Sequence, residues 1–367
     1  MEDNQFDKPK DVPEDIKLEE NKEENEQIVE VKTEEELKNV KDTVDRLEIN
    51  VSIPNLLQTL NKINFQKLEV LSLNDTKITS IDFLINDKFK SLIILELKSN
   101  DIASIQKLSD APLKELKVLD LSSNKISSVE TLAKCPFKDL EILILSNNQI
   151  DKIAPIMDGE FKNLNKLDLC NNKIGEIDTL VKNDSLKNLK YLYLSDNSIS
   201  KISVLKNDIF KNLEELQLDG NKIDSIDDLK EAPFAELQEL YLYNNKIKSI
   251  ASLGNVKFNK LKILNLGKNE IEDIKALGSS KFTELETLDL FDNKIKDISV
   301  LESVPFKAIK HLDLSYNSLV SVEVLNKSNF NFEELKFGGN DSLDYSNPII
   351  QEIYQKYKIK YTFESLI

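Results

Sequence analysis

One pattern returns along most of this chain at intervals of 24 residues. The segments LEVLSLNDTKI and LKVLDLSSNKI align without a gap, and nine further segments align with them. The eleven units begin at Leu68, Leu92, Leu116, Leu140, Leu164, Leu189, Leu213, Leu237, Leu261, Leu285 and Ile309. Every step is 24 residues except the one from Leu164 to Leu189, which is 25. A period of this length is typical of a solenoid, in which each unit packs only on its neighbours.

Each unit follows L-x-x-L-x-L-x-x-N-x-I-x-x-I-x-x-L-x-x-x-x-F-x-x. The part L-x-x-L-x-L alternates apolar and variable residues, which predicts a short strand. One strand per unit, always in the same direction, predicts a long parallel sheet with strands about 4.8 Å apart. The bulkier return side spaces the units more widely, so the stack curves. We therefore expect an α/β repeat fold, a curved solenoid with the parallel sheet on its concave face and short helical or irregular segments on its convex face.

Two other positions of the unit are expected to be structural. The ninth residue is Asn100, Asn124, Asn148, Asn172, Asn197, Asn221, Asn245, Asn269, Asn293 and Asn317, with Thr76 in the first unit. An amide both donates and accepts, so it can satisfy buried backbone groups where the chain leaves the strand. The twenty-second residue is Phe89, Phe137, Phe161, Phe210, Phe234, Phe258, Phe282, Phe306 and Phe330, with Leu113 and Leu186 as substitutes. These rings predict a core spine along the return side.

The repeat resembles the leucine-rich repeat family, in particular the intracellular type with I-x-x-I-x-x-L after the asparagine. The array with its caps, roughly residues 44–360, is also similar to Sds22-type regulatory subunits of protein phosphatase one. That family repeats every 22 residues, whereas this chain repeats every 24 and has a Phe spine and no Trp. The resemblance implies a solenoid that binds proteins, with a phosphatase catalytic subunit as one possible partner.

Both ends of the array carry signals of caps, which an exposed strand edge requires. Thr33 and Glu36 form a capping-box pattern before a short helix. Asn347 and Pro348 begin a second helix, and a strand is predicted over 358–363. The predicted division is an acidic disordered tail over 1–32, a cap helix and degenerate repeat over 33–67, eleven repeats over 68–331, and a partial repeat with a cap over 332–367.

The charge of the chain limits the classes of partner that it is expected to bind. The formal net charge is −16, and residues 1–36 hold fifteen Asp or Glu against five Lys. This acidity disfavours nucleic acid and anionic membranes as partners.

No apolar run approaches the roughly 20 residues of a membrane helix, and the acidic N-terminus is not a secretory signal. We expect a monomer that is located in the cytoplasm or in the nucleus. The tail has three possible roles: solubility, docking of a basic partner, or masking of the binding face.

The variable strand positions should face the concave side, where the repeat leaves their identity free. The first four units place β-branched residues at the third position, and Ile144 joins them from the fifth. Aromatic residues follow in the later units. The predicted partner-binding residues are Val70, Ile94, Val118, Ile142, Ile144, Tyr191, Tyr193, Tyr241, Tyr243, Asp289, Phe291, Asp313 and Tyr316. Strand spacing puts Tyr193 and Tyr241 about 10 Å apart and Asp289 and Asp313 about 5 Å apart. Such rings and apolar strips are common at protein interfaces, although β-branched residues also simply favour strands.

Chemistry other than binding has little support in the sequence. Asp289 and Asp313 are close enough for a glycosidase pair or a cation site, but L-D-L-S is a frequent form of this repeat and the acids are better explained as attracting a basic patch. His311 is the single histidine, and Cys135 and Cys170 fit no metal spacing. We expect no enzyme activity, no cofactor and no metal.

The favoured function is a scaffold or adaptor that binds a partner protein of unknown identity on its concave face. The alternatives are a phosphatase regulatory subunit, as the resemblance implies, or a structural subunit of a cytoskeletal or ciliary assembly. A secreted module similar to bacterial internalins is a further alternative, which the missing signal sequence disfavours.

Overall fold

The computed structural model describes residues 28–182 and 184–358 of the 367-residue chain. Residues 1–27, which hold most of the predicted acidic tail, lie outside these ranges. The same is true of residues 359–363, which hold most of the predicted terminal strand.

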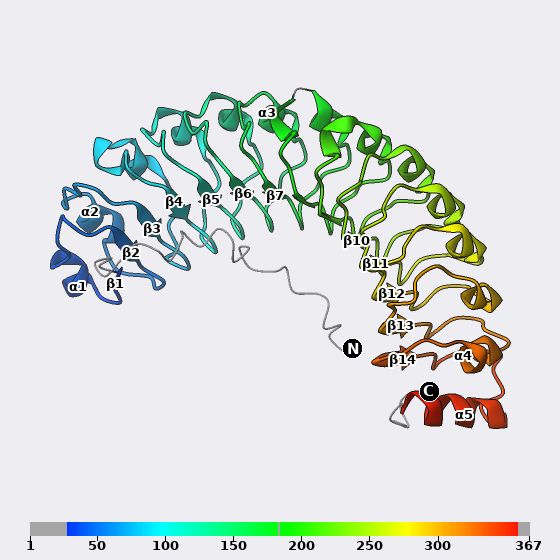
Figure 1. Ribbon diagram of the computed structural model, residues 1–367. Coiled ribbons are helices and arrows are strands. Elements are labelled where there is room, and N and C mark those ends of the chain that lie inside the picture. Colours follow the sequence, from blue (N-terminus) through cyan, green and yellow to red (C-terminus); the bar gives the residue numbers. More distant parts are fainter. Residues whose placement is uncertain (1–27, 183, 359–367) are drawn as a thin grey trace.

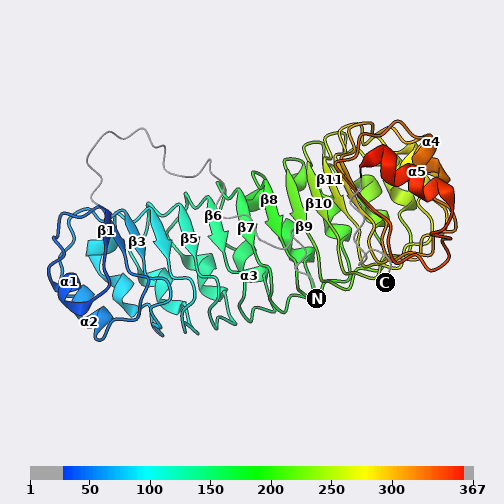
Figure 2. The ribbon, with the colours of Figure 1, turned by 90° about the horizontal axis from the view of Figure 1, so that it is seen from below.

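The described residues form one open sheet of fourteen parallel strands, ordered in space as they are in the chain. The sheet lines the inner side of an arch (Figure 1), and Figure 2 looks up at that side, with the strands next to one another. Each strand has three residues, which in the repeat units are the third to fifth positions. The strands are β1 (Ile28–Glu30), β2 (Arg46–Glu48), β3 (Val70–Ser72), β4 (Ile94–Glu96), β5 (Val118–Asp120), β6 (Ile142–Ile144), β7 (Lys166–Asp168), β8 (Tyr191–Tyr193), β9 (Glu215–Gln217), β10 (Glu239–Tyr241), β11 (Ile263–Asn265), β12 (Thr287–Asp289), β13 (His311–Asp313) and β14 (Glu334–Lys336).

Short helices cover the outer side of the arch and its two ends (Figure 1). In most units the segment I-x-x-I-x-x-L makes a single 3-10 turn that buries its leucine. The α-helices are α1 (Glu34–Lys38), α2 (Leu56–Leu60), α3 (Ala154–Met157), α4 (Glu323–Lys327) and α5 (Pro348–Tyr357). The 3-10 helices are η2 (Asp82–Ile85), η3 (Asp87–Phe89), η4 (Gln106–Asp110), η5 (Glu130–Lys134), η6 (Asp178–Val181), η7 (Asp184–Leu186), η8 (Ser203–Lys206), η9 (Asp208–Phe210), η10 (Asp227–Glu231), η11 (Ala251–Asn255), η12 (Lys275–Ser279) and η13 (Ser299–Glu302).

The ninth-position asparagines join each unit to the one before it, as predicted. The Asn221 amide donates to the carbonyls of Leu194 (2.9 Å) in the preceding unit and Leu218 (3.0 Å) in its own, while its oxygen accepts from the Ile199 N–H (2.9 Å). The same bonds recur from Asn100 to Asn317. Thr76 instead donates to Leu73 within its own unit. We call this series of hydrogen bonds the asparagine ladder. It therefore begins one unit later than the repeat itself.

The phenylalanine spine is buried along the return side. All nine predicted rings are at most 7% exposed. Neighbouring ring centroids are 6.1 Å apart for Phe137 and Phe161 and 5.4 Å apart for Phe234 and Phe258. These rings and the strand leucines form one continuous core, so the spine is structural.

The N-terminal cap begins earlier than the sequence predicted. Residues 28–32 were expected to belong to the acidic tail, but Ile28–Glu30 forms β1 and pairs in parallel with β2. The apolar residues Ile28 and Val29 can extend the sheet although their neighbours in the sequence are acidic, because strands pair through backbone hydrogen bonds. After it, Thr33 and Glu36 make the predicted capping box of α1, which buries Leu37.

The C-terminal cap closes the other edge of the sheet. The Asn347 side chain accepts from the Ile349 N–H (3.0 Å) at the start of α5. The helix buries Ile353 and stacks Tyr354 on Phe337 of the last unit, with ring centroids 5.3 Å apart. Both ends of the apolar core are thus covered.

The one longer unit leaves the sheet undisturbed. Across it, Lys166 still pairs with Tyr191 and Asp168 with Tyr193. The additional residue is taken up on the outer side near η7, where the Ser185 hydroxyl donates to the Gly159 carbonyl (2.9 Å). The concave rows of side chains therefore run in register from end to end.

Candidate interaction surface on the concave face

Two rows of side chains line the concave face, because the first and third residues of each strand point away from the core. The parallel register brings equivalent residues of neighbouring strands side by side. Gln217 pairs with Tyr193 on one side and Tyr241 on the other, and Asp289 pairs with Asp313. The predicted residues of the later units thus share one continuous surface.

The apolar residues of the early units form a small cluster of their own. Val118, Ile142 and Ile144 are buried together, separate from the main core, and Ile94 packs half-buried against them. Val70 is also buried, at 5% exposure. The predicted exposed apolar strip is therefore wrong as to exposure, because these side chains pack on one another. These residues stabilise adjacent strands and offer little free area.

A buried lysine separates this cluster from the aromatic region. Lys166 is 3% exposed, and its ammonium lies 4.8 Å from the centroid of the Tyr193 ring. Burial lowers the pKa of Lys166, while the nearby carboxylates of Asp168 and Glu215 act to raise it. The ring and the carboxylates hold this cation in place of water.

The central tyrosines are anchored by carboxylates. The Tyr193 hydroxyl donates to Glu215 (3.1 Å), and the Tyr241 hydroxyl donates to Glu239 (2.7 Å). Burial and the adjacent carboxylates raise the pKa of both phenols, so they stay protonated as donors. Tyr193 is 2% exposed, which corrects its predicted role as an exposed contact. The half-buried Tyr241 still presents part of its ring.

Gly267 has no side chain, so the Tyr243 ring and the Asp289 carboxylate can both lie close to its Cα atom. A Cβ atom on Gly267 would lie 2.9 Å from the Tyr243 ring and 3.1 Å from the Asp289 Oδ1. The Tyr243 N–H donates to Asp219 (2.6 Å), and Lys268 lies 5.9 Å from the centroid of its ring. The face of the Tyr243 ring thus already lies against the Lys268 ammonium.

Asp289 and Asp313 are in register on β12 and β13. Each accepts a backbone N–H, from Phe291 and Ser315 respectively, at 2.8 Å. Burial and the neighbouring Asp313 charge raise the pKa of Asp289 to about 6. Burial also raises the pKa of Asp313, partly offset by Lys336.

The aromatic residues continue to the end of the array. The rings of Phe291 and Tyr316 meet edge to face with centroids 5.3 Å apart. Tyr316 is 49% exposed and packs over Gly339, where a Cβ would lie 2.9 Å from its ring. This is the most exposed large ring in the described residues, so the predicted aromatic contacts are open at this end of the face.

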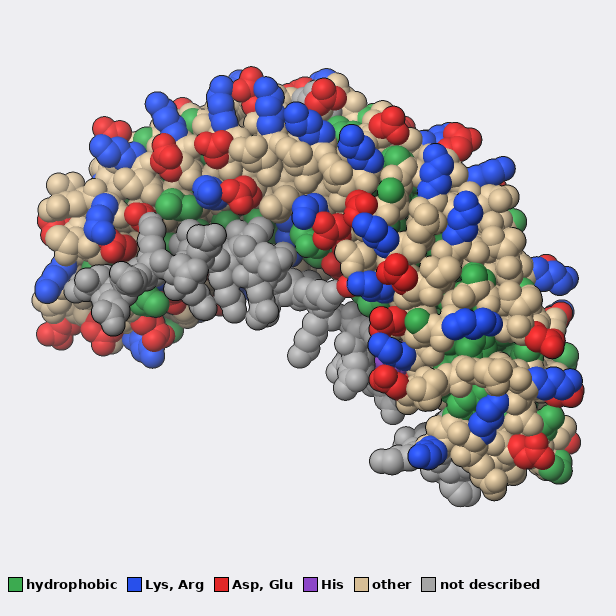
Figure 3. All heavy atoms as spheres, in the orientation of Figure 1, with side chains coloured by type: hydrophobic (Ala, Val, Ile, Leu, Met, Phe, Trp, Pro, Cys, Tyr) green, Lys and Arg blue, Asp and Glu red, His purple; other side chains and the backbone are tan. Residues whose placement is uncertain are grey.

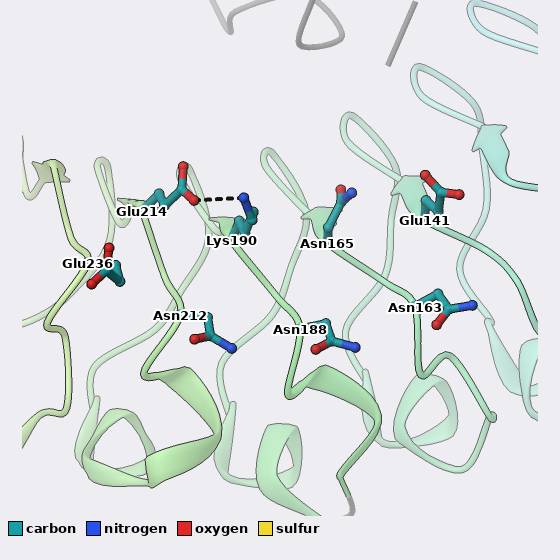
Figure 4. Close-up of a pocket in the computed structure, with 8 residues that line it drawn as sticks. All are labelled: Glu141, Asn163, Asn165, Asn188, Lys190, Asn212, Glu214 and Glu236. Atoms are coloured by element: carbon teal, nitrogen blue, oxygen red, sulfur yellow. Dashed lines mark ion pairs between the residues drawn. The ribbon is translucent and has the colours of Figure 1, made fainter. Parts of the chain in front are cut away.

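A polar hollow lies outside the concave face, on the flank from which the chain enters the strands (Figure 4). Its volume is about 590 Å³. It is lined by Glu141, Asn163, Asn165, Asn188, Lys190, Asn212, Glu214 and Glu236. Along this flank, lysines and glutamates of neighbouring units form ion pairs, for example Lys190 with Glu214 at 2.9 Å and Lys310 with Glu286 at 2.6 Å. Figure 3 shows such charges interleaved over the surface. The hollow lies where the uncharged Asn165 interrupts these pairs.

No group of three or more His, Cys, Asp or Glu in the described residues could hold a metal ion. Burial raises the pKa of both cysteine thiols, to about 12 for Cys135, which suppresses the reactive thiolate. His311 lies 3.7 Å from Glu334 and 3.8 Å from Glu333, a surface arrangement. No helix in the described part of the chain is long and apolar enough to cross a membrane.

The structure brings together the later predicted residues and separates them from the earlier ones. Tyr241, Tyr243, Asp289, Phe291 and Tyr316 share the concave face over β10–β14, whereas the early apolar residues are largely buried. The Tyr–Glu hydrogen bonds were not predicted. Alternation along one strand could have indicated the bond between Glu239 and Tyr241, since residues two apart share a face.

Comparison with protein-family models identifies repeats of one kind. A model described as leucine-rich repeats in two copies matches residues 138–182, 187–231 and 235–279. A second leucine-rich repeat model matches residues 90–150 and 259–319. Together these segments cover more than half of the chain. No curated protein matches the chain in sequence.

Several solved structures share the fold. An internalin from Listeria monocytogenes is 25% identical, with 85% of this chain and 89% of that one covered and a TM-score of 0.65. A leucine-rich repeat protein from Leptospira interrogans is 22% identical, with 89% and 86% covered and a TM-score of 0.70. A plant peptide hormone receptor in complex with its peptide is 17% identical, with 84% and 50% covered and a TM-score of 0.59.

Proposed function

Because this chain belongs to the leucine-rich repeat family, we propose that it is a scaffold that binds a partner protein on its concave face. The observation that carries the proposal is the set of rings over β10–β14. Tyr241, Tyr243, Phe291 and Tyr316 occupy positions that the repeat leaves free, and Tyr316 is 49% exposed. Aromatic residues on a rigid support are typical of protein interfaces.

The shape of the support favours the same role. Every strand is fixed by its neighbours and by the asparagine ladder, so the surface is preorganised and loses little conformational freedom on binding. The plant receptor among the similar structures holds a peptide in its complex. At 17% identity that likeness concerns the fold alone, and binding by this chain stays our proposal.

The proposal also covers the division of the chain, its oligomeric state and its location in the cell. Residues 68–331 would form the binding array, and residues 33–67 and 332–367 would cap it. We propose a monomer without enzyme activity that acts in the cytoplasm or nucleus. The two cysteines are free, which is consistent with a reducing compartment.

Photo-crosslinking tests the binding face directly. A photoreactive amino acid replaces Tyr243 or Tyr316 in the full chain, and crosslinked products are collected from the source cells. Lys248, exposed in the same unit as Tyr243 but beyond the turn that ends the strand, is the control position. We expect the same protein to be captured from both concave positions and not from the control. Equal capture from Lys248 would contradict the proposal.

A narrower role is regulation of a protein phosphatase, supported by the similar number of units between two caps. The 24-residue unit differs from that of the resembled family, so the test must be direct. Purified chain is mixed with the catalytic subunit of protein phosphatase one, and complex formation is measured by calorimetry. Absence of binding at micromolar concentration would leave the general scaffold role and remove this one.

A further inference from the structure

The two halves of the concave face differ in charge. In the five units from Leu213 to Ile309, the third, fifth, seventh and eighth positions hold six acidic residues and one lysine, Lys268. The acidic residues are Glu215, Asp219, Glu239, Asp289, Asp292 and Asp313. The same positions in the five units from Leu68 to Leu164 hold four acidic residues and two lysines. The later half therefore favours a positively charged partner.

Within this half, two carboxylates lie between aromatic rings. Asp289 and Asp313 are directly opposite each other on β12 and β13, an arrangement of like charges that costs stability. Gly267 lets the Tyr243 ring lie close to Asp289 on one side. Phe291, two residues after Asp289, meets Tyr316 on the other side. This part of the surface therefore combines two carboxylates with aromatic rings of neighbouring units.

The nearby lysines neutralise this pair only in part. Lys336 pairs with Asp313 in register but directs its ammonium to Glu334 at 2.9 Å. Lys268 lies over the Tyr243 ring, with its ammonium 5.9 Å from the ring centroid, and makes no ion pair with either carboxylate. In the described residues, neither Asp289 nor Asp313 has a lysine or arginine within ion-pair distance. A cation from outside would therefore relieve the part of the repulsion that Lys336 leaves in place.

We propose that this niche, formed by Tyr243, Asp289, Phe291, Asp313 and Tyr316, receives an arginine side chain from an extended segment of a partner protein. The inference rests on the proposed function and names the chemistry of the partner. A planar guanidinium reaches two carboxylates on adjacent strands, about 4.8 Å apart, and stacks on rings. A lysine is a point charge and would fit one carboxylate only.

The chain's own N-terminus is the weaker candidate occupant. Residues 1–27 hold eleven acidic residues and four lysines, and no arginine. Their net charge has the same sign as that of the niche, so electrostatics favour a basic partner over this segment.

A peptide selection followed by a double-mutant cycle tests the proposal. Random nine-residue peptides displayed on phage are selected on the full chain, and the best binder is synthesised with arginine or with citrulline, its neutral isostere. Binding is measured on the wild type and on Asp289→Asn/Asp313→Asn, whose amide oxygens can still accept the two backbone N–H bonds. Asp151→Asn/Asp224→Asn, which removes two exposed charges from the flank beyond the strands, is the control.

We expect arginine in the selected peptides and a loss of about tenfold or more when citrulline replaces it on the wild type. The loss should shrink to less than about twofold on Asp289→Asn/Asp313→Asn and persist on the control. An equal loss on all three proteins, peptides without arginine, or no selected peptide would overturn the proposal. So would displacement of the peptide by a synthetic copy of residues 1–27.

Crosslinking of the selected peptides distinguishes a failure of the arginine niche from a failure of the proposed function. Peptides that crosslink to the Tyr243 position but do not depend on arginine would refute the arginine niche and leave concave binding intact. Peptides that bind without crosslinking to Tyr243 or Tyr316 would refute both.

Discussion

Asn221 and Asp289 are both buried polar residues, yet the structure accommodates them differently. Asn221 uses its amide and its oxygen in hydrogen bonds to backbone groups of two units. Asp289 accepts one backbone bond and faces the like charge of Asp313. The first residue stabilises the stack, and the second leaves a charge that an outside group can neutralise.

Replacing Asn221 with Ala should lower the free energy of unfolding by about 2–4 kcal/mol. The change leaves the Ile199 N–H without its acceptor and removes donors from three carbonyls, and each unmet buried group costs about 1–3 kcal/mol. Urea unfolding followed by circular dichroism measures the effect. Lys201→Ala, at an exposed site, is the control and should change stability by less than about 0.5 kcal/mol.

Asp289→Asn should change how stability depends on pH. The pKa of Asp289 is raised to about 6 by burial and by Asp313, so its contribution to stability is fully present below about pH 4 and is lost as pH rises through 6. The variant cannot ionise at this position. Between pH 4 and pH 7 its free energy of unfolding should therefore rise by about 1–3 kcal/mol relative to that of the wild type. Lys336 partly offsets the effect in the wild type. Parallel pH dependence of the two proteins in urea titrations would contradict this assignment.

At the scale of elements, no strand or helix in the described part of the chain is long enough to persist alone. The strands have three residues each, and α5, the longest helix, has ten. Helices of that length are marginal in water, so tertiary packing holds them. Stability is then local, because each unit depends on its immediate neighbours.

Disrupting α5 should consequently destabilise only the end of the array. In Ile353→Glu a charge replaces a fully buried side chain, so the helix should detach from the last unit. Hydrogen exchange should accelerate at β13 and β14 and stay unchanged at β3–β5. Gln355→Glu, which adds the same charge at an exposed site of the helix, should leave both regions protected. Uniform acceleration over the whole sheet would show that the array unfolds as one unit.

The whole molecule is a row of equivalent steps rather than a closed globule. Strands pair only with the preceding and following strands in the chain. Register is preserved from β1 to β14, even across the longer unit. Removing a whole step should therefore preserve the architecture.

Deleting residues 237–260, one complete unit, should give a folded protein with an unchanged far-ultraviolet spectrum per residue. The unit from Leu213 would then pack on the unit from Leu261, and Asn269 would bond the carbonyl that Asn245 bonds now. Deleting residues 237–248 instead breaks the period and should give exposed core and aggregation, seen by light scattering. The whole-unit deletion also removes Tyr241 and Tyr243, so it should weaken partner capture.

The sequence predicted the fold well, because leucine, asparagine and phenylalanine at fixed intervals each have one structural reason to recur. It predicted which residues share the concave face, since alternation and register set their direction. Exposure was harder to predict, because Ile142 and Tyr193 are covered by contacts between side chains of different units that the pattern of a single unit does not show. β1 was missed because acidic composition outweighed a short apolar pair. The flank hollow was missed because it arises from an interruption in ion pairs between units.

The direction of the asparagine bonds has a consequence for synthesis on the ribosome. The turn of each unit is completed by an amide of the following unit, as Asn124 completes the turn before Ile102. A newly emerged unit therefore stays incomplete until the ninth residue of its successor leaves the exit tunnel. Folding should lag translation by about one unit throughout, and the last turn is completed by Asn340, which accepts from the Leu319 N–H at 3.0 Å.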